Sequence, residues 1–172
     1  IVNNDIFTTN ADITLIANDT VANGVVAGNR DPGAATIVMA PGKEINAGTG
    51  DVYVKMGQGT GHAGASTSGD MVLSKITGRD MFIEHNGTDS SSSILMADSG
   101  SVITARSVVF DLFNSGAGLG SGGIGTLAMP IKVASNLSTS INVEAHTHVG
   151  TGGVYIESAD NMTIGGAVLF TG

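Results

Sequence analysis

The feature that most constrains this chain is a short motif, two apolar residues separated by one other residue, which recurs from end to end. Each copy is bounded by Gly, Asn, Asp, Ser or Thr, which supply turn backbone, so each triplet predicts a strand of about three to five residues. Because Gly interrupts almost every window, sustained helical spacing is rare. The triplets are ITL at 13–15, IVM at 37–39, VYV at 52–54, MVL at 71–73, MFI at 81–83, ILM at 94–96, VVF at 108–110, INV at 141–143, VYI at 154–156 and MTI at 162–164.

The spacing of the triplets predicts how the strands are connected. A period in the low twenties with two or three short strands is typical of a solenoid, whose turns stack to bury their apolar faces. We therefore predict one all-β repeat region over residues 1–172, a parallel β-helix of about seven coils and roughly 35 Å in length. The separations are 24 residues from Ile13 to Ile37, 23 from Met71 to Ile94, 23 from Ile141 to Ile164, and 27 from Met81 to Val108.

An antiparallel β-sandwich is the alternative fold. Asn23-Gly24 and Asn86-Gly87 are dipeptides that favour hairpin turns. Sandwich strands usually run longer than these triplets, and the period would then be accidental, so the solenoid is the preferred prediction.

Strand alternation predicts which side chains form the core, because the first and third residues of a triplet point to the same face. The residues expected inside are Ile13, Leu15, Val52, Val54, Met71, Leu73, Met81, Ile83, Ile94, Met96, Val108, Phe110, Val154 and Ile156. Small residues before the strands permit corners. The four aspartates expected there, Asp12, Asp51, Asp70 and Asp80, are interpreted as structural acceptors of backbone N–H bonds.

Charge and composition exclude several classes of partner. The net charge is −8 with only seven Lys and Arg, which is too few for a groove that follows phosphates or for an anionic membrane surface. Cysteine is absent, which excludes disulfides and thiolate metal sites. No apolar run approaches the roughly 20 residues of a membrane helix, so no membrane insertion is expected. The abrupt start at IVNND suggests a processed chain or a piece of a longer one.

Several segments resemble the repeats of filamentous-haemagglutinin-type proteins, which are giant secreted bacterial adhesins. The stretches ADITLIANDT, GTGDVYVKMGQG and SILMADSGSVITARSVVFD are similar to those repeats. The most specific part is GIGTLAMPIKVASNL followed by GTGGVYIESADNMTIGG, residues 123–137 and 150–166. The resemblance implies a right-handed parallel β-helix at the bacterial cell surface or outside the cell, and it leaves the ligand open.

The function expected from fold and resemblance is structural and adhesive. A rigid β-helical stalk would serve adhesion, cell contact or matrix, with neighbouring repeats, further copies, and host or bacterial glycans or proteins as partners. A first alternative is a filament subunit that stacks end to end, because open β-helix ends expose unpaired strand groups. A second alternative is a polysaccharide-active enzyme.

Catalysis is not expected. Hydrolases need paired carboxylates at a defined separation, and Asp70, Asp80 and Glu84 form such a set only under an assumed register. Lyases acting on uronates need a cationic site, but the only cations in the middle of the chain are Lys75, Arg79 and Arg106. The Gly-rich segment 115–125 lacks the Lys-Ser/Thr ending of a phosphate loop and is interpreted as a flexible corner loop.

Metal ions and other cofactors are also not expected. Glu144, His146 and His148 alternate and would share one face of a strand, as zinc ligands can. We interpret them as an outward-facing polar strand end. The lone histidines His62 and His85 suggest no site. Sequons occur at Asn18, Asn86, Asn136 and Asn161, at a frequency that this Ser- and Thr-rich composition explains.

The middle residues of some triplets predict a surface contact. These positions should face outward, yet several are apolar or aromatic, and stacked in a ladder they would expose more apolar area than soluble monomers usually do. The residues predicted to pack laterally against another rod or chain are Val72, Phe82, Leu95 and Val109.

Overall fold

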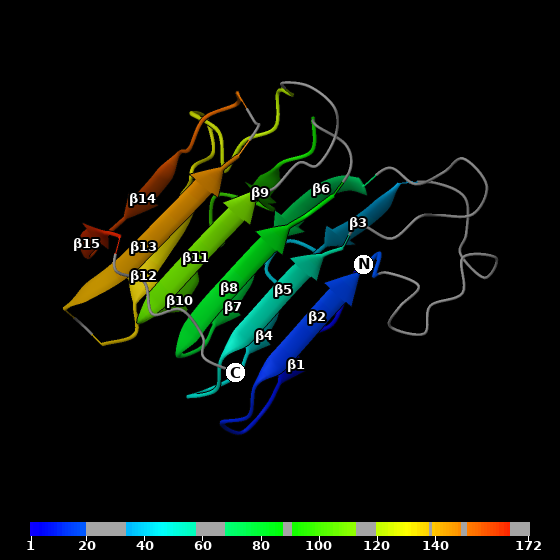
Figure 1. The fold of residues 1–172 in the computed structure, drawn as a ribbon. Helices are drawn as coiled ribbons and strands as arrows, with labels where there is room; N and C mark the ends of the chain where they lie inside the picture. Colours follow the sequence, from blue (N-terminus) through cyan, green and yellow to red (C-terminus); the bar gives the residue numbers. More distant parts are fainter. Residues whose placement is uncertain are drawn as a thin grey trace.

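The structure is a computed structural model that describes residues 1–19, 34–57, 68–87, 91–112, 120–137, 139–148 and 151–165. These residues form fifteen strands and no helix. The strands build three sheets, and every strand pair among them is parallel (Figure 1). The chain is therefore an all-β protein with parallel sheets, an arrangement compatible with a β-helix. The alternative of an antiparallel sandwich was wrong.

The three sheets are named here after their first strands. The β1 sheet contains, in spatial order, β1 (Ile6–Phe7), β4 (Glu44–Asn46), β7 (Lys75–Thr77), β10 (Ile103–Ala105), β12 (Ile131–Ser135) and β14 (Ile156–Ser158). The β2 sheet contains β2 (Ile13–Ala17), β5 (Val52–Met56), β8 (Asp80–His85), β11 (Ser107–Leu112), β13 (Ser140–Thr147) and β15 (Asn161–Ile164). The β3 sheet contains β3 (Ala35–Val38), β6 (Ser68–Leu73) and β9 (Ile94–Met96), and the isolated parallel bridges Val2↔Met39, Ile94↔Ile124 and Ile124↔Val154 extend it.

The chain visits the sheets in a fixed order, first the β3 sheet, then the β1 sheet, then the β2 sheet. We call one such passage a layer. The described residues form six layers, one fewer than the sequence predicted. The layers are, in order, Val2 with β1 and β2; β3 to β5; β6 to β8; β9 to β11; Ile124 with β12 and β13; and Val154 with β14 and β15.

The repeat that generates the layers is irregular. Successive partners in one column of the β2 sheet are separated by 39, 29, 27, 35 and 21 residues; the column is Ile13, Val52, Met81, Val108, Val143 and Ile164. The predicted pairings of Met71 with Ile94 and of Met81 with Val108 are confirmed.

Two predicted pairings are wrong. Ile141 pairs with Met162 instead of Ile164, a shift of two residues. Ile13 pairs with Val52, whereas Ile37 belongs to the β3 sheet. A constant period fails because the connections differ in length.

That variation in length is concentrated at one corner. Connections from the β3 sheet to the β1 sheet, and from there to the β2 sheet, contain at most six residues. Those from the β2 sheet to the next layer contain six to seventeen residues, and they span residues 18–34, 57–67, 86–93, 113–123 and 148–153. Asn86-Gly87 begins one of them and forms no hairpin, since β8 pairs in parallel with β5 and β11. The dipeptide Asn23-Gly24 lies outside the described residues.

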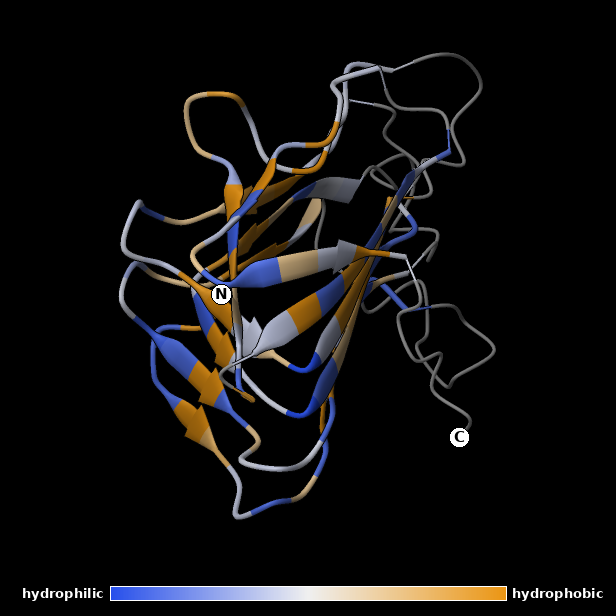
Figure 2. Ribbon diagram, turned by 90° about the vertical axis from the view of Figure 1, so that its left-hand side faces the viewer, coloured by the Kyte–Doolittle hydropathy of each residue, from blue (hydrophilic) through white to orange (hydrophobic). Residues whose placement is uncertain are grey.

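The core is a stack of apolar residues enclosed by the three sheets. Side chains alternate along each strand, as β5 illustrates with Val52, Val54 and Met56 buried and the residues between them half-exposed. Hydrophobic and hydrophilic residues accordingly alternate along the ribbon (Figure 2). Burying each large side chain contributes roughly 1.5–3 kcal/mol. The β1 sheet adds a column that no predicted triplet included, made up of Ile45, Ile76, Ile103 and Val133.

Eleven of the fourteen predicted core residues are buried. Leu15 and Ile156 are half-buried against the core, and Val154 is exposed. All three belong to the first or the last layer, where the described residues provide a neighbouring layer on one side only. The prediction for Val154 was therefore wrong because burial in a stack depends on the layer above as well as on the direction of the side chain.

Glycines allow two layers to approach closely in the segment with the most specific resemblance. Gly125 has a φ of 68°, and a Cβ atom there would lie 2.4 Å from the carbonyl oxygen of Tyr155. Ile124 N–H donates to Gly153 O at 3.0 Å, and Tyr155 N–H donates to Ile124 O at 2.8 Å. Of the segment predicted to be a corner loop, Ile124 joins the β3 sheet, whereas residues 120–123 belong to the connection that precedes it; residues 115–119 lie outside the described part of the chain. Among the described residues, no helix is long and apolar enough to cross a membrane.

Candidate functional site

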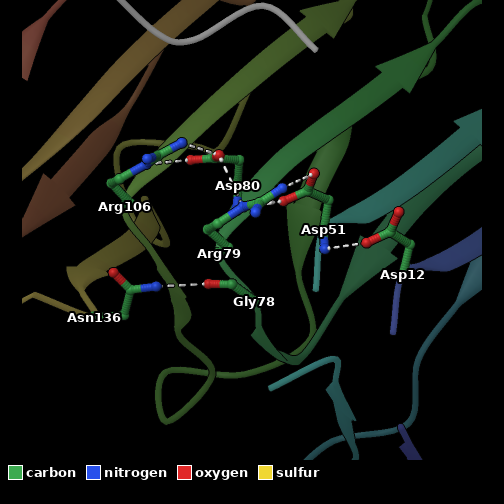
Figure 3. A network of polar contacts seen from close by, with 7 residues as sticks. All are labelled: Asp12, Asp51, Gly78, Arg79, Asp80, Arg106 and Asn136. Carbon is green, nitrogen blue, oxygen red and sulfur yellow. Dashed lines mark hydrogen bonds and ion pairs between the residues drawn. The ribbon is translucent and has the colours of Figure 1, made fainter. Parts of the chain in front are cut away.

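The corner between the β1 and β2 sheets carries a ladder of alternating aspartates and arginines (Figure 3). Asp51 accepts two hydrogen bonds from the guanidinium of Arg79, from Nε at 2.9 Å and from Nη2 at 2.7 Å. Asp80 accepts the same pair of bonds from Arg106, with Nε at 2.9 Å. Nε of Arg79 also lies 3.5 Å from Asp80 Oδ2. Each arginine therefore binds the aspartate of the preceding layer.

The ladder follows from the register of the β2 sheet. Asp12, Asp51 and Asp80 each precede the first inward residue of their strand, so the three occupy one column. The residue immediately before this column is Arg79 in layer three and Arg106 in layer four. Each guanidinium therefore lies beside the carboxylate of the preceding layer. In layer two the same position is Gly50, and a Cβ atom there would lie 2.5 Å from the backbone of Ala11. Asp12 consequently has no arginine above it.

The predicted role of the aspartates as backbone acceptors is confirmed for three of the four. Asp12 accepts the N–H of Asp51 at 2.8 Å, and Asp51 accepts that of Asp80 at 3.3 Å. Asp70 accepts the N–H of Ser93 at 2.8 Å, although it lies in β6 of the β3 sheet instead of the ladder. Each of these bonds joins one layer to the next. The side chains of Asp5 and Asn10 make the same kind of bond.

Two titratable groups in or beside the ladder have raised pKa values. Hydrogen bonding to Asp51, together with the charge of that carboxylate, raises the pKa of Arg79 above its ordinary value. Burial raises the pKa of the Tyr53 phenol, and the carboxylates of Asp51 and Asp12 act in the same direction. The carboxylates thus stabilise the cationic form of the neighbouring guanidinium and oppose a further negative charge nearby.

A groove of about 460 Å³ lies along this corner, lined by Gly48, Thr49, Arg79, Arg106, Asn136 and Leu137. The side chains of Arg79 and Arg106 are 52% and 39% exposed, so their outer edges face solvent while their inner edges hold the aspartates. Asn136 donates from Nδ2 to the carbonyl oxygen of Gly78 at 2.8 Å, which fixes its amide at the groove. In the sequence Arg79 and Arg106 are two of the three cations in the middle of the chain, and no local pattern indicates that the strand register brings them together.

The carboxylates considered for hydrolysis do not form one site. Asp70 lies in the β3 sheet, whereas Asp80 and Glu84 lie in β8 of the β2 sheet. Asp80 is held by Arg106, and Glu84 forms an ion pair of 3.1 Å with Lys55. Lys75 is exposed in β7, away from the ladder.

Glu144, His146 and His148 lie on the outward side of the β2 sheet, as the alternation predicted. His146 Nε2 lies 2.8 Å from Glu144 Oε1, and His148 Nε2 lies 2.9 Å from Asp111 Oδ1. The two imidazole rings are stacked with centroids 6.0 Å apart. In the described part of the chain, no three His, Cys, Asp or Glu residues are arranged to hold a metal ion.

His85 has a structural position that its isolation in the sequence did not suggest. Its side chain is fully buried, with Nε2 2.8 Å from Gly69 O and Nδ1 accepting from Gly87 N–H at 3.3 Å. The ring therefore links layer three to the connection that follows it. His62 lies outside the described residues.

The sequon asparagines differ in how far their amides are engaged. Asn18 Nδ2 lies 3.3 Å from Gly57 O, and Asn86 Nδ2 lies 3.3 Å from Glu84 Oε1. The Nδ2 of Asn136 is held by Gly78, whereas Asn161 is exposed in β15. The first three amides thus hold backbone or side-chain oxygens in place.

The four residues predicted to make a lateral contact lie on two sheets. Val72 pairs with Leu95 in the β3 sheet, and Phe82 pairs with Val109 in the β2 sheet. They therefore form two separate ladders instead of one stripe. Val109 is 3% exposed despite its outward position, so it offers little area to a partner. Lateral packing through either ladder stays a prediction.

Comparisons with family models, with curated proteins and with solved structures found no match to this chain. The class is thus defined by the fold, an all-β protein with parallel sheets and a ladder of ionic bonds at one corner. The resemblance of its repeats to filamentous haemagglutinins stays a prediction.

Proposed function

We propose that this chain is a structural, adhesive segment of a large extracellular bacterial surface protein. In this proposal its layers are coils of a right-handed parallel β-helix, since crossovers between parallel strands of one sheet are almost always right-handed. The segment acts as a rigid stalk for adhesion, cell contact or matrix, and no catalytic role is assigned to it. Each layer adds about 4.8 Å of length.

The observation that carries the proposal is the exposure of apolar side chains in the last layer. Met162 and Ile164 occupy the columns of the buried residues Ile141 and Val143, so their side chains belong to the inward-facing set. Both are nevertheless exposed, and Ile164 reaches 73%. Inward-facing apolar side chains with no described residue packed above them favour a stack that continues into further layers.

The first layer, at the opposite end, also has a neighbouring layer on one side only among the described residues. β1 and β2 each have one strand neighbour among the described residues. A shallow pocket of about 220 Å³ opens at this end, lined by Ile1, Val2, Leu15, Ile16, Ala17, Thr36, Ile37 and Val38. Neighbouring repeats of the same architecture would cover both ends.

Stiffness is supported by polar bonds that cross from layer to layer. Side chains of Asp5, Asn10, Asp12, Asp51 and Asp70 each accept a backbone N–H from the following layer. These bonds add to the strand ladders and restrict sliding or opening between layers. A stalk needs this resistance, because it transmits force along its axis.

The second candidate is a filament subunit, and the same end layers favour it. In a parallel ladder, alternate residues bond to opposite neighbours. Ile13 N–H donates to Asp51 O and Ala17 O accepts from Gly57 N–H, so Thr14 and Ile16 direct their peptide groups to the outer edge of β2. Gly165 N–H donates to Val143 O, so Ile164 directs its peptide group to the outer edge of β15. The two edges are complementary in parallel register.

Electron microscopy of the native material tests the proposal. Rods attached to cells would support the stalk, whereas free filaments would support the filament subunit. Isolated compact particles would contradict both.

A further inference from the structure

The groove beside the ladder carries hydrogen-bond donors that the ladder leaves unused. A guanidinium has five N–H groups, and Arg79 and Arg106 each commit two of them to a carboxylate. The remaining N–H groups lie on the exposed side of each arginine, which lines the groove. Because the aspartates hold both guanidiniums in place, a ligand would order little of the protein on binding.

An acceptor and an apolar contact complete the groove. Asn136 uses its Nδ2 to bind Gly78 O, and its Oδ1 makes no hydrogen bond within the described residues. Leu137 lies next to it and is 56% exposed. Donors, an acceptor and an apolar surface thus line one cavity of about 460 Å³, within the usual range of roughly 300–1,000 Å³ for small-molecule sites.

The charge of the ladder selects the class of ligand. At the groove each guanidinium is neutralised by one carboxylate, Arg79 by Asp51 and Arg106 by Asp80, so this part of the ladder has no net positive charge. The whole chain carries −8. An anionic ligand would therefore meet a repulsive field. The groove fits an uncharged ligand with many hydroxyl groups and an apolar face, which is the chemistry of a neutral sugar.

We propose that this groove binds an uncharged glycan. Hydroxyl oxygens accept from the outer N–H groups of Arg79 and Arg106, another hydroxyl donates to Asn136 Oδ1, and the C–H face of a ring packs on Leu137. The groove runs from layer two to layer five, about 14 Å at 4.8 Å per layer, so a short oligosaccharide fits along it. The inference rests on the proposed adhesive role for its setting and names the ligand class of that role.

Binding of defined oligosaccharides to the purified chain tests this assignment. The probes are neutral oligosaccharides, with uronic-acid and sulfated oligosaccharides of matched length for comparison, and affinity is measured by calorimetry. We expect some neutral probes to bind and Leu137→Ser to weaken that binding about tenfold, because a ring face loses its apolar contact. Leu127→Ser is the matched control, since Leu127 lies in the same layer, is 83% exposed and does not line the groove.

A second variant examines the guanidinium separately from its charge. Arg106→Lys keeps a positive charge beside Asp80 but loses the bidentate fork and the outer N–H groups, so binding of the neutral probes should weaken, measured at a temperature where the variant is folded. Tighter binding of the acidic probes, no binding of any neutral probe, or equal effects of the two leucine variants would each overturn the proposal. Since none of these measurements detects rods, the stalk proposal and the groove proposal fail separately.

Discussion

The carboxylate of Asp51 holds the guanidinium of Arg79 through two hydrogen bonds of 2.9 and 2.7 Å, although the two residues are 28 positions apart in the sequence. The aspartate is almost completely buried, while the arginine is half-exposed. The pair therefore joins the interior of one layer to the surface of the next.

Removing the charge of Asp51 should destabilise the protein. Asp51→Asn keeps the shape of the side chain but leaves the Arg79 fork opposite an amide, so the midpoint of denaturant unfolding should fall clearly. Glu157→Gln is the control, because Glu157 and Lys132 are both exposed and 3.5 Å apart, and such surface pairs contribute little. Equal shifts in the two variants would show that the ladder contributes no more than a surface ion pair.

Placing a charge in the core should distinguish buried from terminal positions. Ile83→Asp buries a carboxylate at a position with no solvent access and should cost several kcal/mol, on the order of 4. Ile164→Asp adds the same charge to an exposed position of the same sheet and should change stability by about 0.5 kcal/mol or less. Chemical denaturation measures both. If Ile83→Asp unfolded like the parent, the inward register of β8 would be wrong.

Alanine substitutions at two glycines distinguish the cost of backbone strain from the cost of a steric clash. Gly42 and Gly125 both have positive φ, 75° and 68°, but a Cβ atom at Gly42 meets nothing within 4 Å. Gly42→Ala should cost about 1 kcal/mol, the left-handed backbone penalty alone. Gly125→Ala adds a contact of 2.4 Å with Tyr155 O and should cost several times more. Similar melting temperatures for the two variants would contradict the close approach of layers five and six.

Acid should weaken the connection between β9 and β10 through Asp98. Burial acts to raise the pKa of Asp98, but hydrogen bonds from Ser101 and from the N–H groups of Gly100 and Ser101 outweigh it, so the pKa is lowered. A carboxyl with a lowered folded-state pKa stabilises the fold above its ordinary value of 3.8, and this contribution is lost as the pH falls through the lowered value.

Asp98→Asn measures that contribution. The stability difference between parent and variant should be largest at neutral pH and should shrink below about pH 4. A difference that stays constant down to about pH 2 would contradict the assignment.

Edge variants test the filament alternative. Ile16→Pro and Ile164→Pro each remove one outward N–H at opposite ends of the β2 sheet, and proline is tolerated on edge strands. If copies stack head to tail, the parent forms polymers, each variant alone stays monomeric, and an equal mixture stops at dimers. Light scattering distinguishes these states. Dimers formed by one variant alone would indicate a symmetric contact instead.

The sequence predicts the strands and their inward faces well because both depend on alternation over a few residues, as at Val52 and Val54. It predicts pairing less well, because pairing depends on the length of connections that carry no strand signal. The Ile13–Ile37 spacing matched the expected period by chance, while the real partner, Val52, is 39 residues away.

The groove illustrates the same limit. Thr49, Arg79, Arg106 and Asn136 come from four layers, and no local pattern links them. Only the register of the β2 sheet places them together, and that register became visible with the structure. One weak signal is present in the sequence. The dipeptides Gly50-Asp51, Arg79-Asp80 and Arg106-Ser107 each place a small polar residue directly before the first inward residue of a strand, and these polar residues align in one column.

The concentration of long connections at a single corner has a consequence for how such a chain changes over generations. The connections between the β2 sheet and the following layer range from six to seventeen residues without disturbing the strand register, whereas those at the other two corners never exceed six. Long gene segments acquired by recombination would therefore persist mainly on one side of the molecule. That side is where a protein engineer would graft a foreign epitope, with the other two sides left as the scaffold.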